Sequence, residues 1–208
     1  MDEAGSISSS GPRYATTMTG KVRIIGGSWR GRKLDVLPLP GLRPSGDRSR
    51  ETLFNWIGPS IHGSRCMDLF AGTGVLGLEA ASRGASSVTL VERAAPAIER
   101  IREQIKDWPQ QERVMLVNAD ALKWLPGQDI SFDLVFIDPP HGLGLQIKAL
   151  ELLLKHQLLS SSGRVCVEHG MREDWVAGHQ SWLEEHFVLA RSGRFGQVGL
   201  GLFRVSTL

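Results

Sequence analysis

A carboxylate, two prolines and a ring stand together at Asp138-Pro139-Pro140-His141, directly after the apolar run 132–137. The run is typical of a buried strand, and the prolines stiffen the turn that follows because they fix φ and lack an N–H. The carbonyl groups that precede the prolines remain available as hydrogen-bond acceptors. Such a turn suits a flat substrate that bears an amino group, such as a nucleobase, so these four residues are the candidate catalytic group. The alternative is an ordinary Pro-Pro turn at the end of a strand.

A glycine-rich segment upstream is the second candidate for chemistry. The apolar run 66–70 leads into three spaced glycines: Gly72, Gly74 and Gly77. A helical pattern follows at 75–83, and a strand, a glycine turn and a helix in this order form the nucleotide-binding half of a doubly wound sheet. The next strand, at 87–92, ends in Glu92, where a carboxylate can accept hydrogen bonds from both hydroxyl groups of a ribose.

The glycine spacing alone is compatible with two cofactors. It matches the fingerprint for NAD, and it also suits S-adenosylmethionine. Asp68 lies just before the turn, where it would repel a pyrophosphate but attract the ammonium group of a methionine. The strand that ends at Asp138 is expected to lie beside the strand of Asp68, so that both turns face one crevice. These two features favour S-adenosylmethionine.

Positive charge is concentrated near the amino terminus. Residues 21–50 hold eight bases and two acids, a net charge of +6, whereas the rest of the chain holds 16 bases and 20 acids, a net charge of −4. A basic segment attached to a mildly acidic body is a plausible site for a polyanion such as nucleic acid. The alternative is a solvated charged face.

The elements that must position these groups follow an alternating pattern. Two short strands at 22–27 and 32–36 form a hairpin, and a helix at 48–57 begins after Asp47 as N-cap and ends at Gly58-Pro59. The later strands are predicted at 66–70, 87–92, 114–118, 132–137, 163–169, 187–194 and 197–204, and the helices at 75–83, 94–107, 120–124, 144–158 and around 173–185. The pattern predicts an α/β fold, with a mostly parallel sheet covered by helices on both faces and closed by an antiparallel hairpin.

The bulk composition excludes several classes of protein. With 208 residues and 41% hydrophobic content, the chain can bury one good core. No apolar stretch reaches the ~18 residues of a membrane span, and residues 1–20 read as a disordered tail. Cys66 and Cys166 lie in apolar runs, which indicates buried thiols in a reducing cytoplasm. The cysteines and histidines lack the spacing of metal ligands, so no metal site is expected.

The chain resembles the Rossmann-like S-adenosylmethionine-dependent methyltransferases, and more closely the RsmD family, over about residues 21–204. Four blocks carry the resemblance: residues 23–34 (RIIGGSWRGRKL), residues 42–56 (LRPSGDRSRETLFNW), residues 68–74 (DLFAGTG) and Asp138-Pro139-Pro140. The first two blocks single out this family, whereas the last two are shared with many amino-methylating enzymes. One departure is His141, since the family usually has Phe or Tyr there. An imidazole is flat and can stack on a base, but it is smaller and titratable.

The resemblance implies a class I methyltransferase fold with a seven-stranded sheet and an antiparallel carboxyl-terminal hairpin. It implies a monomeric cytoplasmic enzyme that uses S-adenosylmethionine to methylate the exocyclic N2 of a guanine in 16S ribosomal RNA, within an assembled or assembling small subunit. The chain would divide into a tail at 1–20, an RNA-binding unit at 21–60 and a methyltransferase domain at 61–208.

Individual roles follow from the matched motifs. Asp138 and the Pro139 carbonyl would hold the target amine, and Asp120 would accept a hydrogen bond from the adenine amino group, with helix capping as its alternative role. The residues expected to bind the cofactor are Asp68, Phe70, Ala71, Gly72, Thr73, Gly74, Glu92, Arg93, Asp120 and Ala121. The residues expected to bind RNA are Arg23, Trp29, Arg30, Arg32, Lys33, Arg43, Arg48 and Arg50. The alternative for Arg48 and Arg50, at the start of a helix, is to line the active-site cleft.

Three other readings remain open. An N6-adenine methyltransferase that acts on DNA or RNA uses a similar Asp-Pro-Pro-aromatic turn. An NAD-dependent oxidoreductase would fit the glycine spacing. A non-catalytic RNA-binding factor in ribosome assembly would retain the fold without the reaction.

Overall fold

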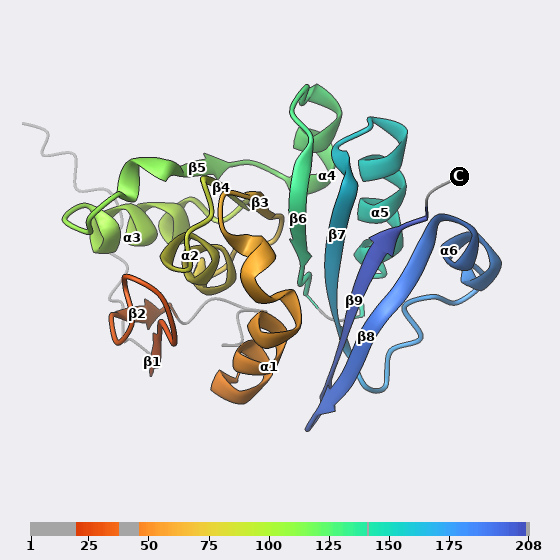
Figure 1. Cartoon of the computed structure of the whole chain (residues 1–208), viewed down its shortest axis with the longest axis horizontal. Helices are drawn as coiled ribbons and strands as arrows, with labels where there is room; N and C mark the ends of the chain where they lie inside the picture. Colours follow the sequence, from red (N-terminus) through yellow and green to blue (C-terminus); the bar gives the residue numbers. More distant parts are fainter. Residues whose placement is uncertain (1–19, 38–45, 141, 207–208) are drawn as a thin grey trace, which may run out of the picture.

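The computed structural model describes residues 20–37, 46–140 and 142–206. The predicted tail up to residue 19, the predicted RNA contact Arg43 and the ring of His141 lie outside these ranges. Within them, a two-stranded hairpin precedes a seven-stranded sheet with helices on both faces (Figure 1). The predicted fold class is therefore confirmed.

The main sheet has the order β5-β4-β3-β6-β7-β9-β8. Its strands are β3 (Arg65–Asp68), β4 (Ser87–Glu92), β5 (Val114–Asn118), β6 (Phe132–Ile137), β7 (Leu159–Gly170), β8 (Phe187–Phe195) and β9 (Val198–Val205). Strands β3 to β7 are parallel, and β9 runs antiparallel between β7 and β8. Since β6 is hydrogen-bonded to β3, the predicted neighbourhood of the two candidate turns is confirmed.

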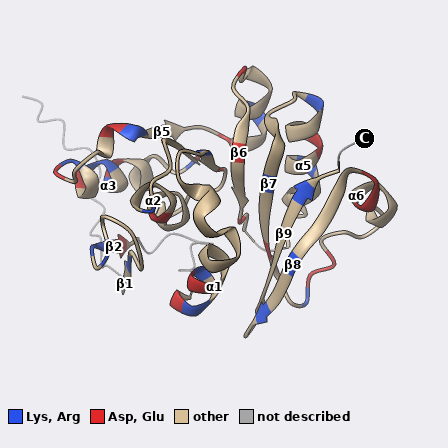
Figure 2. Cartoon of the chain, viewed as in Figure 1, with Lys and Arg blue, Asp and Glu red and all other residues tan. Residues whose placement is uncertain are grey.

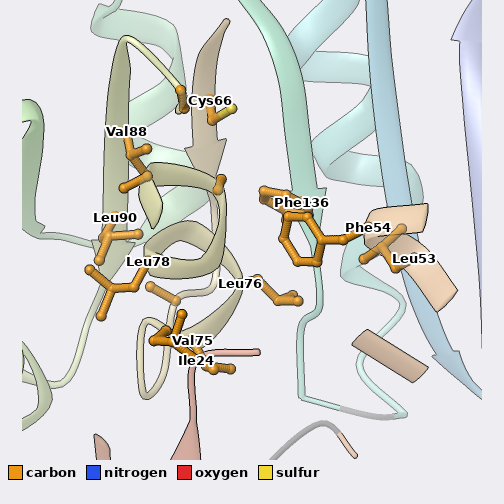
Figure 3. Close-up of a cluster of buried hydrophobic side chains, with 14 of the residues drawn as sticks. Ile24, Leu53, Phe54, Cys66, Val75, Leu76, Leu78, Val88, Leu90 and Phe136 are labelled. Carbon is orange, nitrogen blue, oxygen red and sulfur yellow. The ribbon is translucent and has the colours of Figure 1, made fainter. Parts of the chain in front are cut away.

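The helices cover the two faces of the sheet in separate groups. They are α1 (Asp47–Ile57), α2 (Val75–Ser82), α3 (Ala95–Ile105), α4 (Ala121–Trp124), α5 (Leu145–Lys155) and α6 (Gln180–His186). One part of the core joins α1, α2, α3 and the hairpin to the sheet, whereas the other joins α4, α5 and α6 to the opposite face. Figure 3 shows the first part, where Phe54 of α1 and Phe136 of β6 pack at a centroid distance of 5.8 Å. No helix among the described residues is long and apolar enough to cross a membrane.

Two sequence predictions about helix ends are wrong. The helix expected around 173–185 begins only at Gln180, and the residues before it form turns. Asp47 is not the N-cap of α1, because Gly46 occupies that position and Asp47 is the first helical residue. The Asp47 carboxylate is instead used in ion pairs with Arg23 and Arg50. The helix ends as predicted at Gly58, whose φ of 63° suits a glycine.

The amino-terminal hairpin, β1 (Gly20–Arg23) and β2 (Lys33–Val36), shares its core with the rest of the molecule. Ile24 and Leu34 are fully buried against the helices of that face. The turn between the strands approaches α2 closely, since a Cβ on Gly27 would lie 1.8 Å from the carbonyl oxygen of Ser82. Residues 21–60 and 61–208 are thus packed as one unit. The separate functions expected of these two segments remain a prediction.

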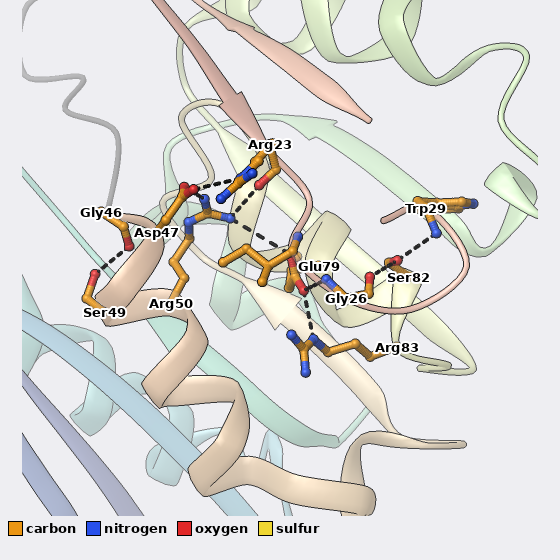
Figure 4. A network of polar contacts seen from close by, with 12 residues as sticks. Arg23, Gly26, Trp29, Gly46, Asp47, Ser49, Arg50, Glu79, Ser82 and Arg83 are labelled. Carbon is orange, nitrogen blue, oxygen red and sulfur yellow. Dashed lines mark hydrogen bonds and ion pairs between the residues drawn. The ribbon is translucent and has the colours of Figure 1, made fainter. Parts of the chain in front are cut away.

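A buried carboxylate on α2 fastens the hairpin to the body (Figure 4). Glu79, which is fully buried, accepts hydrogen bonds of 2.7 Å from the backbone N–H groups of Ile25 and Gly26. It also accepts one from Nε of Arg83, and Nη1 of Arg50 lies 3.8 Å from its Oε2. Buried charges are tolerated when they are paired and hydrogen-bonded in this way. Glu79 thus joins α1, α2 and the hairpin through one side chain.

Candidate active site

The carboxyl ends of five neighbouring parallel strands surround a cavity of about 490 Å³. Open α/β sheets bind ligands at this edge, where the strand order reverses. Here the reversal lies between β3 and β6, because the chain builds outward to β5 before it returns to β6. Most of the predicted site residues line the cavity: Asp68, Phe70, Ala71, Gly72, Thr73, Glu92, Arg93, Asp120, Ala121, Asp138, Pro139 and Pro140.

The turn between β3 and α2 has the backbone that its glycines allow. Gly72 and Gly74 have φ values of 54° and 75°, in the left-handed region that favours glycine. Gly74 is the N-cap of α2 and is not among the residues that line the cavity, so its contact with the cofactor remains a prediction. Gly77 allows α2 to approach the sheet, since a Cβ there would lie 2.1 Å from a methyl carbon of Leu90.

Asp68 ends β3 beneath this turn with only 1% of its surface exposed. Its Oδ2 accepts a hydrogen bond of 3.0 Å from the N–H of Gly77. The pKa of Asp68 is raised to about 7, mainly by burial; the hydrogen bond from Gly77 opposes this rise, and the charges of Asp138 and Glu92 add to it. An opposite charge nearby favours the ionised form of a carboxyl group. A cation that binds beside Asp68 would therefore keep its carboxylate ionised and pair with it.

Glu92, at the end of β4, is held in place by two backbone donors. Its Oε2 accepts from the N–H of Gly72 at 2.9 Å, and its Oε1 accepts from the N–H of Ala94 at 2.8 Å. Each carboxylate oxygen has a second lone pair, so both can still accept a hydrogen bond from a ligand in the cavity. The geometry therefore fits the pair of hydroxyl groups on a ribose.

Asp120 follows β5 and caps α4. Its Oδ1 accepts hydrogen bonds from the N–H groups of Leu122 and Lys123, at 3.1 and 3.2 Å. The capping role that the sequence left open is therefore confirmed. Asp120 also lines the cavity, so a contact between its carboxylate and an adenine amino group remains a prediction.

The turn after β6 brings Asp138 to the same cavity as Asp68 and Glu92. Asp138 is half-buried, Pro139 is buried, and Pro140 is half-buried. Glu168, on β7, also lines the cavity with only 7% of its surface exposed, and it was missed in the sequence. It could have been found, because it stands near the end of an apolar run, as Glu92 and Asp138 do.

The predicted RNA contacts divide into exposed and buried residues. Trp29 is 1% exposed, and its Nε1 donates a hydrogen bond to the carbonyl of Pro109. Arg50 is also 1% exposed, and it donates to Asp47 and to the carbonyl of Arg23. The prediction that Trp29 and Arg50 bind RNA is therefore wrong, since both are part of the core. The other predicted contacts in the described residues are exposed: Arg23, Arg30, Arg32, Lys33 and Arg48.

Comparison with known proteins agrees with this geometry. A family model described as "Conserved hypothetical protein 95" matches residues 22–203. The chain is 43% identical over 152 residues to ribosomal RNA small subunit methyltransferase D of Haemophilus influenzae, which covers 72% of this chain and 79% of the relative. It is 37% identical over 186 residues to the protein of the same name from Escherichia coli, which covers 89% of this chain and 91% of the relative.

A solved structure shows the same arrangement of elements. The putative methyltransferase yhhF from Escherichia coli superimposes with a TM-score of 0.76 at 36% sequence identity, covering 91% of this chain and all of the other. The matches extend over both the hairpin and the sheet, as the first two sequence blocks predict. The chain belongs to the family that includes ribosomal RNA small subunit methyltransferase D.

Proposed function

We propose that this protein transfers a methyl group from S-adenosylmethionine to the exocyclic N2 of a guanine in 16S ribosomal RNA. The observation that carries the proposal is the meeting of the turn after β3 and the turn after β6 in one cavity. One turn offers sites for a cation and a ribose, and the other offers acceptors for an amino group. The family membership supports ribosomal RNA of the small subunit as the substrate.

The cavity fits the cofactor in its order of polar groups. Asp68 and the Gly72 backbone would hold the charged methionine end, Glu92 the ribose, and the residues after β5 the adenine. When bound, S-adenosylmethionine supplies a methyl group that its positively charged sulfur activates for displacement. The task of the protein is then mainly to position the nucleophile.

Asp138 and the Pro139 carbonyl would act on the guanine amine. The lone pair of this nitrogen is delocalised into the ring, so the amine is a weak nucleophile. Two hydrogen bonds donated by the NH2 group, to the carboxylate and to the carbonyl, hold the nitrogen in a pyramidal geometry with its lone pair directed at the methyl group. The nitrogen gains its bond to the methyl carbon as the carbon–sulfur bond breaks and a neutral thioether leaves. The nitrogen then loses one proton, which the Asp138 carboxylate or water takes up. The base must leave its stack to reach the cavity.

The direct test is transfer of labelled methyl from S-adenosylmethionine to small ribosomal subunits that lack the modification, followed by nucleoside analysis. N2-methylguanosine in 16S ribosomal RNA is the expected product. N6-methyladenosine would contradict the assigned base, and subunits without label would favour a non-catalytic assembly factor. A nicotinamide cofactor that copurifies with the protein would favour an oxidoreductase.

We infer a cytoplasmic, monomeric enzyme in which residues 21–60 contribute the RNA-binding surface. Cys66 and Cys166 are both free and buried, which suits a reducing compartment. The exposed bases of the hairpin and of α1, blue in Figure 2, supply the positive charge for phosphate contacts.

Affinity for S-adenosylmethionine is expected to rise with pH between about 6 and 7.5. The folded pKa of Asp68 is about 7, so below this pH the cation must displace a proton from the carboxyl group before it pairs with the carboxylate. The expected gain approaches tenfold per pH unit well below the pKa and levels off above it. Calorimetric titration at several pH values gives the profile, and Asp68→Asn is expected to flatten it. An equally steep profile in the variant would assign the proton to another group.

Removal of exposed positive charge from the hairpin and α1 is expected to weaken RNA binding and flatten its salt dependence. The triple variant Arg30→Ala, Lys33→Ala, Arg48→Ala should reduce the slope of log affinity against log salt by roughly 2 to 3, because each lost phosphate contact removes about 0.7 to 0.9. Filter binding at several salt concentrations measures the slope. The matched control removes three exposed bases elsewhere: Lys123, Lys155 and Arg204. Equal slopes for the two variants would contradict a specific RNA surface.

A further inference from the structure

The acids at the cavity follow the order of the strands. Asp120 stands after β5, Glu92 at the end of β4, Asp68 at the end of β3, Asp138 after β6 and Glu168 near the end of β7. The first three are assigned above to the adenine, the ribose and the methionine of the cofactor. Asp138 is assigned to the target amine. Glu168 lies one strand beyond Asp138, on the side away from the cofactor residues. The reaction proposed above gives it no role.

The strand register places Glu168 and Asp138 next to each other. Phe136 pairs with Cys166 and Ile137 with Val167, so the next step along both strands brings Asp138 level with Glu168. Neighbouring strands are about 4.8 Å apart, and side chains two positions apart share a face. Glu168 therefore lies on the face of Cys166, which is the side covered by α1 and the hairpin. This is the side on which the exposed RNA-binding candidates stand.

The surroundings of Cys166 support this placement. Burial raises the pKa of its thiol, and the charges of Glu168, Asp138 and Asp68 raise it further, so three carboxylates lie near one sulfur atom. Glu168 and Asp138 both line the cavity, and Glu168 is nearly buried. A ligand held between them must present hydrogen-bond donors to both carboxylates, because an ionised carboxylate only accepts.

Guanine presents two such donors side by side on its Watson–Crick edge, the N1–H and the N2 amino group. Adenine has an N6 amino group, but its N1 is an acceptor. We propose that Glu168 selects guanine by accepting a hydrogen bond from N1–H while Asp138 accepts from the N2 amine. A carboxylate has about four lone-pair sites, so this bond adds to any contacts that Glu168 makes within the protein. The inference rests on the proposed function, and it assigns to Glu168 the discrimination between guanine and adenine.

Adenine is rejected by the same carboxylate. An adenine with its N6 amine at Asp138 would place the N1 lone pair against Glu168, and the buried acceptors would then face each other without a proton between them. Sites built around buried polar groups discriminate strongly against a ligand that leaves these groups unpaired. Glu168 is thus a specificity-determining residue, whereas Asp138 acts on the reacting nitrogen.

The wild-type enzyme provides the first test. The target guanosine, once mapped, is replaced by 2-aminopurine riboside in 16S ribosomal RNA that is then assembled into small subunits. This base keeps the amine at position 2 but has no proton on N1. The expected result is a loss of kcat/KM of about 10- to 100-fold. Equal kcat/KM on both bases would overturn the proposal without any variant. A wild-type enzyme that forms no N2-methylguanosine would instead overturn the proposed function itself.

The variant Glu168→Gln provides the second test, since its amide can donate a hydrogen bond to an unprotonated N1. The expected result is a lower kcat/KM on guanine and a higher one on 2-aminopurine than the wild type shows, so that the ratio of the two shifts by about 10-fold or more. The comparison of the two enzymes is needed because 2-aminopurine also lacks the oxygen at position 6, a difference that the wild type and the variant both meet. Calorimetry with S-adenosylmethionine confirms that the variant is folded. A folded variant that changes both substrates by the same factor would show a merely structural role and overturn the proposal. Glu185→Gln, on the exposed face of α6, is the matched control and is expected to keep the wild-type ratio.

Discussion

Replacement of Asp138 by alanine is expected to lower kcat by roughly 10³-fold or more while the affinity for S-adenosylmethionine changes only a few-fold. The carboxylate stands after β6, whereas the groups assigned to the cofactor stand after β3, β4 and β5. The variant therefore keeps the cofactor half of the cavity and loses the acceptor that directs the lone pair of the amine. The effect falls on kcat because the hydrogen bond orients the reacting nitrogen.

Single-turnover methyl transfer and calorimetric titration separate these two effects. Asp129→Ala removes a carboxylate from an exposed loop before β6 and serves as the matched control, with wild-type values expected for both. Substantial residual turnover in the Asp138 variant would refute the assigned role. A parallel loss of cofactor affinity would mean that Asp138 belongs to the cofactor site.

Replacement of Glu79 by alanine is expected to lower the free energy of unfolding by about 3 to 5 kcal/mol. The variant leaves the buried guanidinium of Arg50 without one of its two acidic neighbours, and it removes the acceptor for two backbone N–H groups of the hairpin. Burial lowers the pKa of Arg50, and the charges of Asp47 and Glu79 oppose this shift. The loss of Glu79 therefore removes a charge that stabilises the ionised guanidinium.

Urea denaturation followed by circular dichroism measures the effect. Glu103→Ala, on the exposed side of α3, makes the same chemical change at the surface and is expected to alter the free energy of unfolding by less than about 0.5 kcal/mol. A Glu79 variant as stable as this control would show that the hairpin is held by its apolar residues alone.

Much of the fold follows from local patterns. The runs at 87–92, 114–118 and 132–137 have the predicted bounds, because buried parallel strands are short, apolar and bounded by turns. The place of β6 beside β3 follows from the topology of doubly wound sheets, and it correctly brings Asp138 to the glycine turn. The end of α1 at Gly58 follows from the backbone that only glycine adopts easily.

The errors concern polar residues whose partners are distant in sequence. Arg50 reads as one of a series of exposed bases, but its partner Glu79 is brought to it only by the packing of α2 against α1. Trp29 stands in a glycine-rich turn, where the sequence suggests an exposed aromatic ring. In the structure it packs edge-on against Trp108, with the ring centroids 5.2 Å apart. Asp47 has the residue type expected of an N-cap, but its carboxylate pairs with Arg23 and Arg50 instead. Net charge describes a segment, whereas burial depends on contacts that the segment does not contain.

The position of β9 between β7 and β8 has a consequence for synthesis on the ribosome. The outer edge of β7 bonds to β9 along seven residue pairs, from Arg164 with Arg204 to Gly170 with Val198. Translation delivers β8 before β9, so β7 keeps an open edge until the last strand of the described chain has left the exit tunnel. An open edge of an apolar strand can pair with other chains. Released chains that end before residue 198 are therefore expected to bind chaperones more strongly than chains that extend past residue 206.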